Sequence, residues 1–220
     1  NEMLTCIDVD VVYISTPIGT HYELAARALK AGKHVWCEKP LTCSLEDSKD
    51  LVSIAKKNNK MLVEAFMHLY HPQFDRVQNY INDDINGNIY SVVCRFGMPP
   101  LEEPGFRNNK HLGGGAFWDI ASYPVSAVAK LFSNQNVKIL FSEILRIDNS
   151  SVENGGRAIL RFSEGPTAYL EWGVGIGYKN EVDIWSEKGS FFTDKIFSKP
   201  SKFQTKYQIR DLKGNENIKT

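Results

Sequence analysis

The sequence predicts an α/β protein in which part of a parallel sheet is followed by an α+β domain with an open, mainly antiparallel sheet. Two patterns indicate this. Over residues 9–67, apolar runs alternate with helical spacings in the order β-α-β-α-β, and right-handed crossovers make such a series a parallel sheet. From residue 70 onward, short segments of period two are separated by turn residues. We therefore expect a first domain at 1–69 and a second at 70–220.

The first domain begins with a run that is typical of a strand buried on both faces, because residues 9–15 are nearly all apolar or β-branched. In order, we expect a strand at 9–15, a helix at 21–31, a strand at 34–37, a helix after Ser44 and a strand at 61–67. Gly32 is a typical stop for the first helix. Ser44 is a typical N-cap for the second, with Asp47 three residues on as in a capping box.

The second domain is predicted to be a helix, a strand, a long loop, a second helix and an antiparallel meander. We expect a helix from Pro72, a strand at 89–98, a loop at 99–115, a helix at 117–132 and strands at 137–147, 157–163, 167–174, 181–185 and 190–193. One face of this sheet is expected to be apolar and aromatic, with Tyr169, Trp172 and Trp185 on it. The polar end from Lys213 is expected to fray.

Composition excludes several classes of function. Equal numbers of basic and acidic residues, 26 of each, give no net field toward nucleic acid or an anionic membrane. The four cysteines lack the spacing of a zinc site and the density of a disulfide scaffold. No apolar run approaches the ~18 to 20 residues that span a bilayer, and no signal peptide is evident. We expect a cytoplasmic protein with neither a nucleic-acid nor a membrane partner.

Polar residues stand where two predicted parallel strands end. The first strand runs into Ser15-Thr16-Pro17, and the second runs into Glu38-Lys39-Pro40. Ligands of open parallel sheets bind beyond the carboxyl ends of the strands, so both segments are candidates for a binding edge. A charged pair before proline is also common in a solvated turn, and this motif alone leaves that alternative open.

The second motif is a triple glycine followed by a helix. Gly113, Gly114 and Gly115 permit positive φ and a close approach of backbone to a ligand. Asp119 and Tyr123 are four residues apart and are expected to share a helical face. Taken singly, these features also fit a flexible loop, a solvated carboxylate and a core aromatic. The two motifs together favour a site.

In combination the motifs resemble those of the family of glucose-fructose oxidoreductase, inositol dehydrogenase and the rhizopine catabolism enzymes. The resemblance covers residues 9 to about 190 and runs in order through Val11 to Ser15, Thr16-Pro17, His21, Ala31 to Val35, Glu38-Lys39-Pro40, His71-Pro72, Phe106-Arg107 and Gly113 to Tyr123. It implies that the parallel sheet is part of a Rossmann-type domain. It also implies a two-domain oxidoreductase that uses NAD or NADP.

The resemblance also implies residue roles. Lys39 of the Glu-Lys-Pro motif is implied to be catalytic and to contact substrate, and Tyr123 is implied to be the acid/base at a position where the family often has histidine. Asp119 is implied to contact substrate hydroxyls. The implied cofactor-binding residues are Ser15, Thr16, Pro17, His21, Glu38, Lys39, Pro40 and Arg107.

The implied reaction moves a hydride between the nicotinamide and an alcohol carbon of a sugar, polyol or dihydrodiol. A general base must remove the hydroxyl proton, and tyrosine, with a pKa of ~10, is mostly protonated at neutral pH. We expect the Lys39 ammonium to lower the pKa of Tyr123 and to hydrogen-bond the substrate oxygen.

Two other readings remain open. A dinucleotide-binding sensor of the same fold would bind cofactor without turnover. Alternatively, the chain is an inactive truncated fragment, because no Gly-x-Gly-x-x-Gly fingerprint precedes residue 9; on that reading we expect weak or no cofactor binding by this chain alone. We expect no metal site, since His68 and His71 have no completing ligand pattern. The family resemblance further implies a homodimer or homotetramer formed through the open sheet, with a sugar-like small molecule as the other partner.

Overall fold

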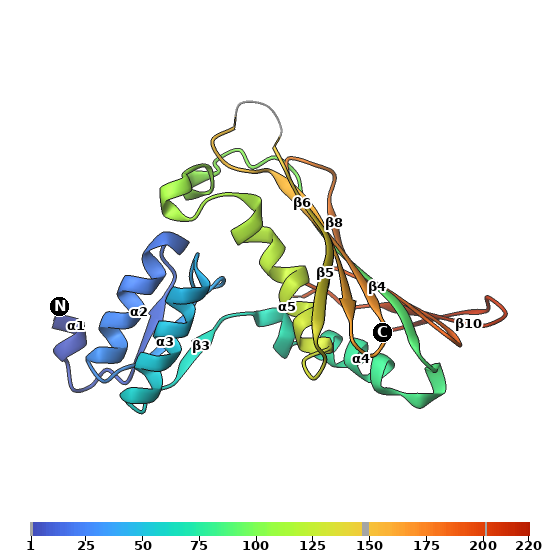
Figure 1. The fold of residues 1–220 in the computed structure, drawn as a ribbon, viewed down its shortest axis with the longest axis horizontal. Helices are drawn as coiled ribbons and strands as arrows, with labels where there is room; N and C mark the ends of the chain where they lie inside the picture. Colours follow the sequence, from blue (N-terminus) through green and yellow to red (C-terminus); the bar gives the residue numbers. More distant parts are fainter. Residues whose placement is uncertain (1, 147–149, 201) are drawn as a thin grey trace.

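The computed structural model describes residues 2–146, 150–200 and 202–220, and it contains two separate β-sheets with different strand arrangements (Figure 1). The first is a three-stranded parallel sheet, and the second has eight strands, most of them antiparallel. The predicted fold class is confirmed. The boundary expected between residues 69 and 70 falls in the segment that links the two sheets and stays a prediction.

The first sheet has the strand order β1-β2-β3. Its elements are α1 (Glu2–Thr5), β1 (Val11–Ile14), α2 (His21–Lys30), β2 (His34–Cys37), α3 (Leu45–Lys57) and β3 (Leu62–Glu64). Ile14 pairs with Cys37, so β1 and β2 end side by side. At the start of α3 the Ser44 hydroxyl accepts the N–H of Asp47 at 3.2 Å, which confirms the predicted cap.

One side of β1 is exposed in the described residues. β1 is not buried on both faces, because Val11 and Tyr13 are 52% and 55% exposed. It is an edge strand, and Val12 and Ile14 alone face the core formed with α2 and α3.

The second sheet has the order β11-β10-β9-β8-β4-β7-β6-β5. Its strands are β4 (Ile89–Met98), β5 (Val137–Leu145), β6 (Gly155–Phe162), β7 (Thr167–Val174), β8 (Lys179–Ser186), β9 (Gly189–Asp194), β10 (Tyr207–Asp211) and β11 (Glu216–Lys219). β4 lies between β7 and β8 and runs parallel to β7. The sheet is thus a meander with β4 inserted at its centre.

Two helices cover one face of the large sheet, the face turned toward the first unit (Figure 1). These helices are α4 (Pro72–Asn82) and α5 (Ser122–Leu131), and α5 is preceded by a π-helical turn at Phe117–Ala121. Short 3₁₀ turns occupy Ile18–Thr20, Met67–Tyr70, Asp84–Asn86, Gly105–Asn108 and Lys110–Leu112. The last two lie inside the loop predicted at 99–115.

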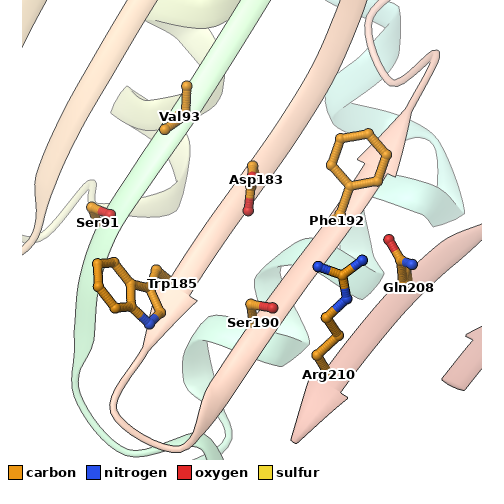
Figure 2. Close-up of a pocket in the computed structure, with 8 residues that line it drawn as sticks. All are labelled: Ser91, Val93, Asp183, Trp185, Ser190, Phe192, Gln208 and Arg210. Carbon is orange, nitrogen blue, oxygen red and sulfur yellow. The ribbon is translucent and has the colours of Figure 1, made fainter. Parts of the chain in front are cut away.

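The other face of the large sheet is open. Tyr169 and Trp185 lie on it, 40% and 61% exposed, as expected, but Trp172 does not. Trp172 is 6% exposed and belongs to the core, because it is an odd number of residues from Tyr169 and so points to the opposite face. Figure 2 shows a hollow on the open face, lined by Ser91, Val93, Asp183, Trp185, Ser190, Phe192, Gln208 and Arg210.

The C-terminal end is more ordered than expected. Instead of fraying from Lys213, the chain forms the β10–β11 hairpin, in which Arg210 pairs with Glu216 at 3.0 Å. The Asp211 carboxylate accepts the backbone N–H groups of Lys213 and Asn215 and so fixes the turn. Polar composition hid a strand that is held by its turn and by pairing with β9.

Within the described ranges, no helix is long and apolar enough to cross a membrane. Nor do those ranges bring together three or more histidine, cysteine or acidic residues in a way that could hold a metal ion.

Candidate active site

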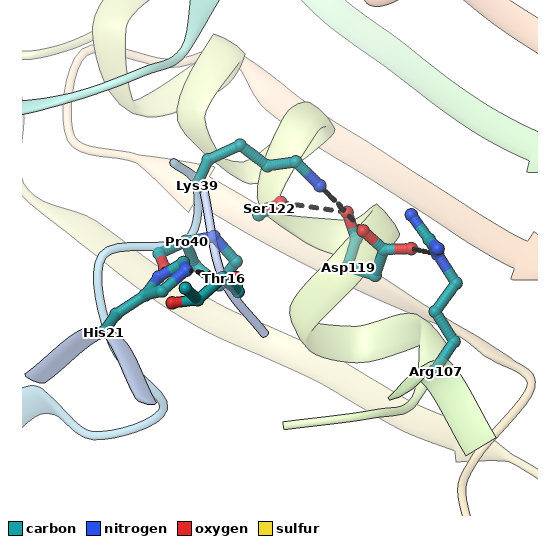
Figure 3. Close-up of polar contacts among 7 residues, drawn as sticks. All are labelled: Thr16, His21, Lys39, Pro40, Arg107, Asp119 and Ser122. Atoms are coloured by element: carbon teal, nitrogen blue, oxygen red, sulfur yellow. Dashed lines mark hydrogen bonds and ion pairs between the residues drawn. The ribbon is translucent and has the colours of Figure 1, made fainter. Parts of the chain in front are cut away.

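The side chain of Lys39 joins the two halves of the molecule. It follows β2, and its Nζ donates to the backbone oxygen of Asp119 at 2.6 Å and to Oδ1 of Asp119 at 2.8 Å (Figure 3). Asp119 lies in the π-helical turn before α5. These residues are 80 positions apart in the sequence, and both side chains are at most 10% exposed. A buried ion pair therefore forms where the two predicted motifs meet.

Tyr123 lies directly beneath this pair. Lys39 Nζ is 4.5 Å from the centroid of the Tyr123 ring, which is a cation–π distance. The ring is 7% exposed and packs among Phe66, His68, Phe96 and Phe197. Its hydroxyl has no hydrogen-bond partner among the described residues. The oxygen is not fully buried, so it can reach solvent or a ligand.

The expected effect of Lys39 on Tyr123 was wrong. The pKa of Tyr123 is raised above its usual value, first by burial and then by the negative charges of Asp119 and Glu38, while Arg107 acts in the opposite direction. Lys39 lies over the ring and gives its hydrogen bonds to Asp119. The positive charge of Lys39 is therefore balanced by the Asp119 carboxylate, and Tyr123 remains a protonated phenol.

Asp119 is held by two cations. Oδ1 accepts from Lys39, and Oδ2 accepts from Arg107 Nε at 2.6 Å (Figure 3). Burial raises the pKa of Asp119, but Lys39 and Arg107 outweigh that effect and hold it below its usual value. The carboxylate is therefore ionised and oriented. A wider turn carries it, since residues 117–121 are π-helical, and such turns are frequent at functional sites.

Glu153 fixes the start of this helical segment, and no sequence pattern pointed to it. Its carboxylate accepts the N–H of Phe117 at 2.8 Å, and its backbone oxygen accepts the N–H of Ala116 at 3.0 Å. Gly115, at φ +110°, leaves the space that the Glu153 carboxylate fills. The triple glycine thus serves close packing inside the protein. Glu153 lies in the loop before β6, where an isolated glutamate gives no signal.

His21 ties together the two strand-end loops. Its Nε2 lies 2.9 Å from the Thr16 oxygen and its Nδ1 lies 3.0 Å from the Pro40 oxygen, and the ring is 1% exposed (Figure 3). The Lys39-Pro40 bond is cis. Next to this loop the Glu64 carboxylate accepts the N–H of Leu41 at 2.7 Å. His21 and Glu64 therefore position the backbone on either side of Lys39, and Glu64 was not predicted.

The remaining predicted residues lie at the carboxyl ends of β1 and β2. Ser15 and Thr16 are exposed, and Pro17 is half-buried beside them. Glu38 accepts the Tyr13 hydroxyl at 2.6 Å, on the open face of the small sheet. Lys39, Arg107, Asp119 and Tyr123 converge, whereas the hydrogen bonds of Thr16 and Glu38 go to Thr20 and Tyr13, and Glu38 acts on Tyr123 only through its charge.

Two family models match the chain, and together they account for most of it. Residues 1–66 match "Oxidoreductase family, NAD-binding Rossmann fold", and residues 74–192 match "GFO/IDH/MocA C-terminal domain". The chain belongs to the GFO/IDH/MocA family. Its family membership confirms the resemblance on which the site residues were chosen, although the roles of those residues stay predictions.

Named relatives include sugar reductases. The chain is 34% identical over 197 residues to a dTDP-3,4-didehydro-2,6-dideoxy-alpha-D-glucose 3-reductase of Actinomadura kijaniata, a match that spans 90% of this chain and 59% of the relative. It is 28% identical to a trans-1,2-dihydrobenzene-1,2-diol dehydrogenase of Xenopus laevis, over 83% of this chain and 54% of the relative.

A solved structure of an A. kijaniata 3-ketoreductase with NADP and TDP-benzene superposes with a TM-score of 0.92 at 30% identity, covering 99% of this chain and 66% of that one. The chain therefore spans about three fifths of the length of the curated sugar reductase.

Proposed function

We propose that the protein is an NAD(P)-dependent oxidoreductase that reduces a ketone on a sugar, with Tyr123 as proton donor and Lys39 as the group that orients the reacting oxygen. The observation that carries this proposal is the convergence of Lys39, Asp119 and Tyr123 from different halves of the chain. Relatives named as a sugar 3-reductase and a 3-ketoreductase support it.

The raised pKa of Tyr123 suits the role of proton donor in a reduction. Reduction of a ketone generates an alkoxide, which needs a proton donor within hydrogen-bond reach. A phenol whose pKa is raised by burial and by Asp119 keeps its proton at neutral pH and supplies it to that oxygen. Oxidation would need the phenolate, which the same surroundings disfavour.

Lys39 would act from a fixed position. Two of its N–H donors are taken by Asp119, so the third remains for the substrate oxygen. Asp119, held by Arg107 on its other side, keeps the ammonium in place. We keep the predicted contact of Asp119 with substrate hydroxyls as part of this proposal, since a carboxylate oxygen accepts more than one hydrogen bond.

The residues at the carboxyl ends of β1 and β2 fit one half of a dinucleotide site. Ser15 and Thr16 offer exposed hydroxyls, and Pro17, His21, Glu38 and Pro40 shape the two loops beside them. Ligands of such sheets bind at this edge. A bound nicotinamide would supply the hydride. Arg107 is the proposed wall of this site on the second domain, and its guanidinium is the one that pairs with Asp119.

Replacement of Tyr123 tests the proposal. In the protein expressed from its own gene, Tyr123→Phe is expected to cut turnover about 100-fold or more with little change in KM, as loss of a general acid does. Consumption of reduced cofactor with keto-sugar substrates measures it. Tyr22→Phe is the control, because it removes a hydroxyl that donates to Asp50 on the surface of the first domain, away from the site. Equal turnover in Tyr123→Phe and the wild type would reject the assignment.

A second function, a dinucleotide-binding sensor, predicts a different outcome. It would bind NADP or NADPH and turn over none of a panel of keto-sugars and sugar alcohols. The oriented Asp119 and the solvent-accessible hydroxyl of Tyr123 favour the enzyme.

We also propose that two copies pair through the open face of the large sheet. Three aromatic residues on that face are at least 40% exposed, namely Phe141, Tyr169 and Trp185. An apolar surface of this kind marks an interface. Sedimentation is expected to give a dimer or tetramer that Phe141→Glu dissociates. Leu212→Glu, at an exposed site in the β10–β11 turn, is expected to leave the assembly intact.

A further inference from the structure

A second cavity, of about 260 Å³, lies behind the Tyr123 ring. Its lining comes from the linker between the sheets and from the segment after β9, and includes His68, His71, Phe197, Ser198, Lys199 and Phe203. The rings of His68 and Phe197 form its inner wall, and their centroids are 5.4 and 6.0 Å from that of Tyr123. The cavity is therefore one ring away from the proposed proton donor.

Basic groups gather here without an acidic partner. Lys199 is half-buried, and its Nζ donates to the backbone oxygen of Ile196 at 3.1 Å. Burial lowers the pKa of Lys199. Burial, followed by repulsion from Lys199, lowers the pKa of His71, while Asp75 acts in the opposite direction. No carboxylate is among the described residues that line the cavity.

The histidines offer unused hydrogen-bonding capacity. His71 Nδ1 accepts the N–H of Gln73 at 3.1 Å, so in the neutral ring the proton is on Nε2, which remains a free donor. His68 is 1% exposed, and its Nδ1 is one of the few described side-chain atoms that are buried without a partner. Buried polar groups in native proteins are normally satisfied, by ligand or water where not by protein.

We propose that this cavity binds a phosphate or diphosphate group, with Lys199, the Nε2–H of His71 and the Ser198 hydroxyl as donors. An ammonium that the protein does not neutralise is stabilised by an anion, and phosphate oxygens accept hydrogen bonds from Lys199 and from the neutral His71 and Ser198 donors. The proposal deepens and rests on the proposed function, because a diphosphate seated here would belong to a nucleotide-linked sugar whose ring lies near Tyr123. The apolar face of Phe203 would then border the group attached to the phosphate.

Calorimetric titration with inorganic pyrophosphate tests the subsite in the whole protein. The wild type is expected to bind saturably, with proton uptake seen as a dependence of the heat on the ionisation enthalpy of the buffer. Lys199→Met is expected to weaken binding about 10-fold or more, as loss of a charge-assisted hydrogen bond does. Lys188→Met is the matched control, since Lys188 is exposed in the β8–β9 turn, outside the cavity.

A second variant guards against loss of structure. His71→Asn keeps a side-chain oxygen that can cap α4 but removes the Nε2 donor, and it is expected to weaken binding while leaving the thermal midpoint unchanged. Absence of saturable binding by the wild type, or equal binding by Lys199→Met and Lys188→Met, would overturn the proposal.

Thymidine diphosphate and NADP identify the source of the anion. Tighter binding of thymidine diphosphate than of pyrophosphate, lost in Lys199→Met, assigns the cavity to a nucleotide-sugar substrate. Competition by NADP but not by thymidine diphosphate supports an anion site that serves the cofactor instead. The Tyr123→Phe variant is expected to retain pyrophosphate binding. A failed subsite with intact dependence of turnover on Tyr123 therefore leaves the proposed function standing.

Discussion

The buried charge at Asp119 is neutralised by neighbouring side chains, whereas the charge of Lys199 is not, although both regions lie close to Tyr123. At Asp119 one buried carboxylate is matched by two cations, each within hydrogen-bond distance. At Lys199 a half-buried cation lies beside two histidines whose pKa values are lowered by burial and then by its charge, and its Nζ donates to the backbone oxygen of Ile196.

This difference separates two uses of charged groups. A charge neutralised by the protein itself is oriented before any ligand arrives, as a reacting site requires. Cations left without a counter-ion cost stability, and a ligand that supplies the missing charge recovers it. On this view the Asp119 region positions chemistry and the Lys199 cavity takes up an anion.

The largest expected change in stability comes from removing the negative charge of Asp119, which leaves its two cations unneutralised, as Lys199 is in its cavity. Asp119→Asn keeps the size of the side chain but leaves Lys39 and Arg107 without their counter-ion. Removing one partner of a buried ion pair typically costs about 3 kcal/mol or more. We expect the free energy of unfolding in urea to fall by about that amount with an unchanged m-value. Unaltered stability would mean that solvent already compensates the two cations.

Acid should act on the second region. Burial, followed by repulsion from Lys199 and Lys39, lowers the pKa of His68 from 6.5 to about 3. The unfolded chain therefore binds a proton as the pH falls through 6.5, while the folded protein takes it up only near pH 3. The contribution of His68 to the free energy of unfolding is therefore complete above pH 6.5. Between pH 6.5 and about pH 3 it falls by about 1.4 kcal/mol for each pH unit.

His68→Phe should weaken the dependence of the free energy of unfolding on pH below 6.5, because phenylalanine fits the same aromatic surroundings and does not titrate. Urea unfolding at several pH values measures it. Ser126→Ala keeps the titrating ring and removes its 3.4 Å contact at Nε2 together with a hydrogen bond to the Tyr123 backbone oxygen, so it should keep the slope of the wild type. An identical slope in His68→Phe would show that His68 is not the group responsible.

Local patterns predicted most of the fold. β4 and β7 have the predicted bounds, and Ser44 caps the predicted helix, because these features depend on neighbours in sequence. The covering of a face depends on distant segments, and there the prediction failed at Trp172. β11 was missed because pairing with β10, not composition, holds its polar residues.

The sequence predicted which residues meet at the site but not which hydrogen bonds they form. Sequence and family resemblance selected Lys39, Asp119 and Tyr123, which the structure brings together. Which acceptor the Lys39 amine chooses depends on three-dimensional placement, so the sign of the shift in the pKa of Tyr123 was wrong. Glu153 and Glu64 hold backbone N–H groups, a role that any isolated glutamate could have.

The smallest expected effects are changes in stability of opposite sign, and they test directly whether the two regions differ in how their charges are neutralised. Arg107→Met removes a cation that pairs with Asp119, and since its side chain is 39% exposed we expect a loss of about 1 kcal/mol or less. Lys199→Met removes a cation whose charged form burial disfavours, so in phosphate-free buffer we expect equal or slightly greater stability than in the wild type. Parallel urea titrations of the two variants measure both. If Lys199→Met destabilises the protein as much as Arg107→Met does, then the cavity is already neutralised from within, and it needs no anion.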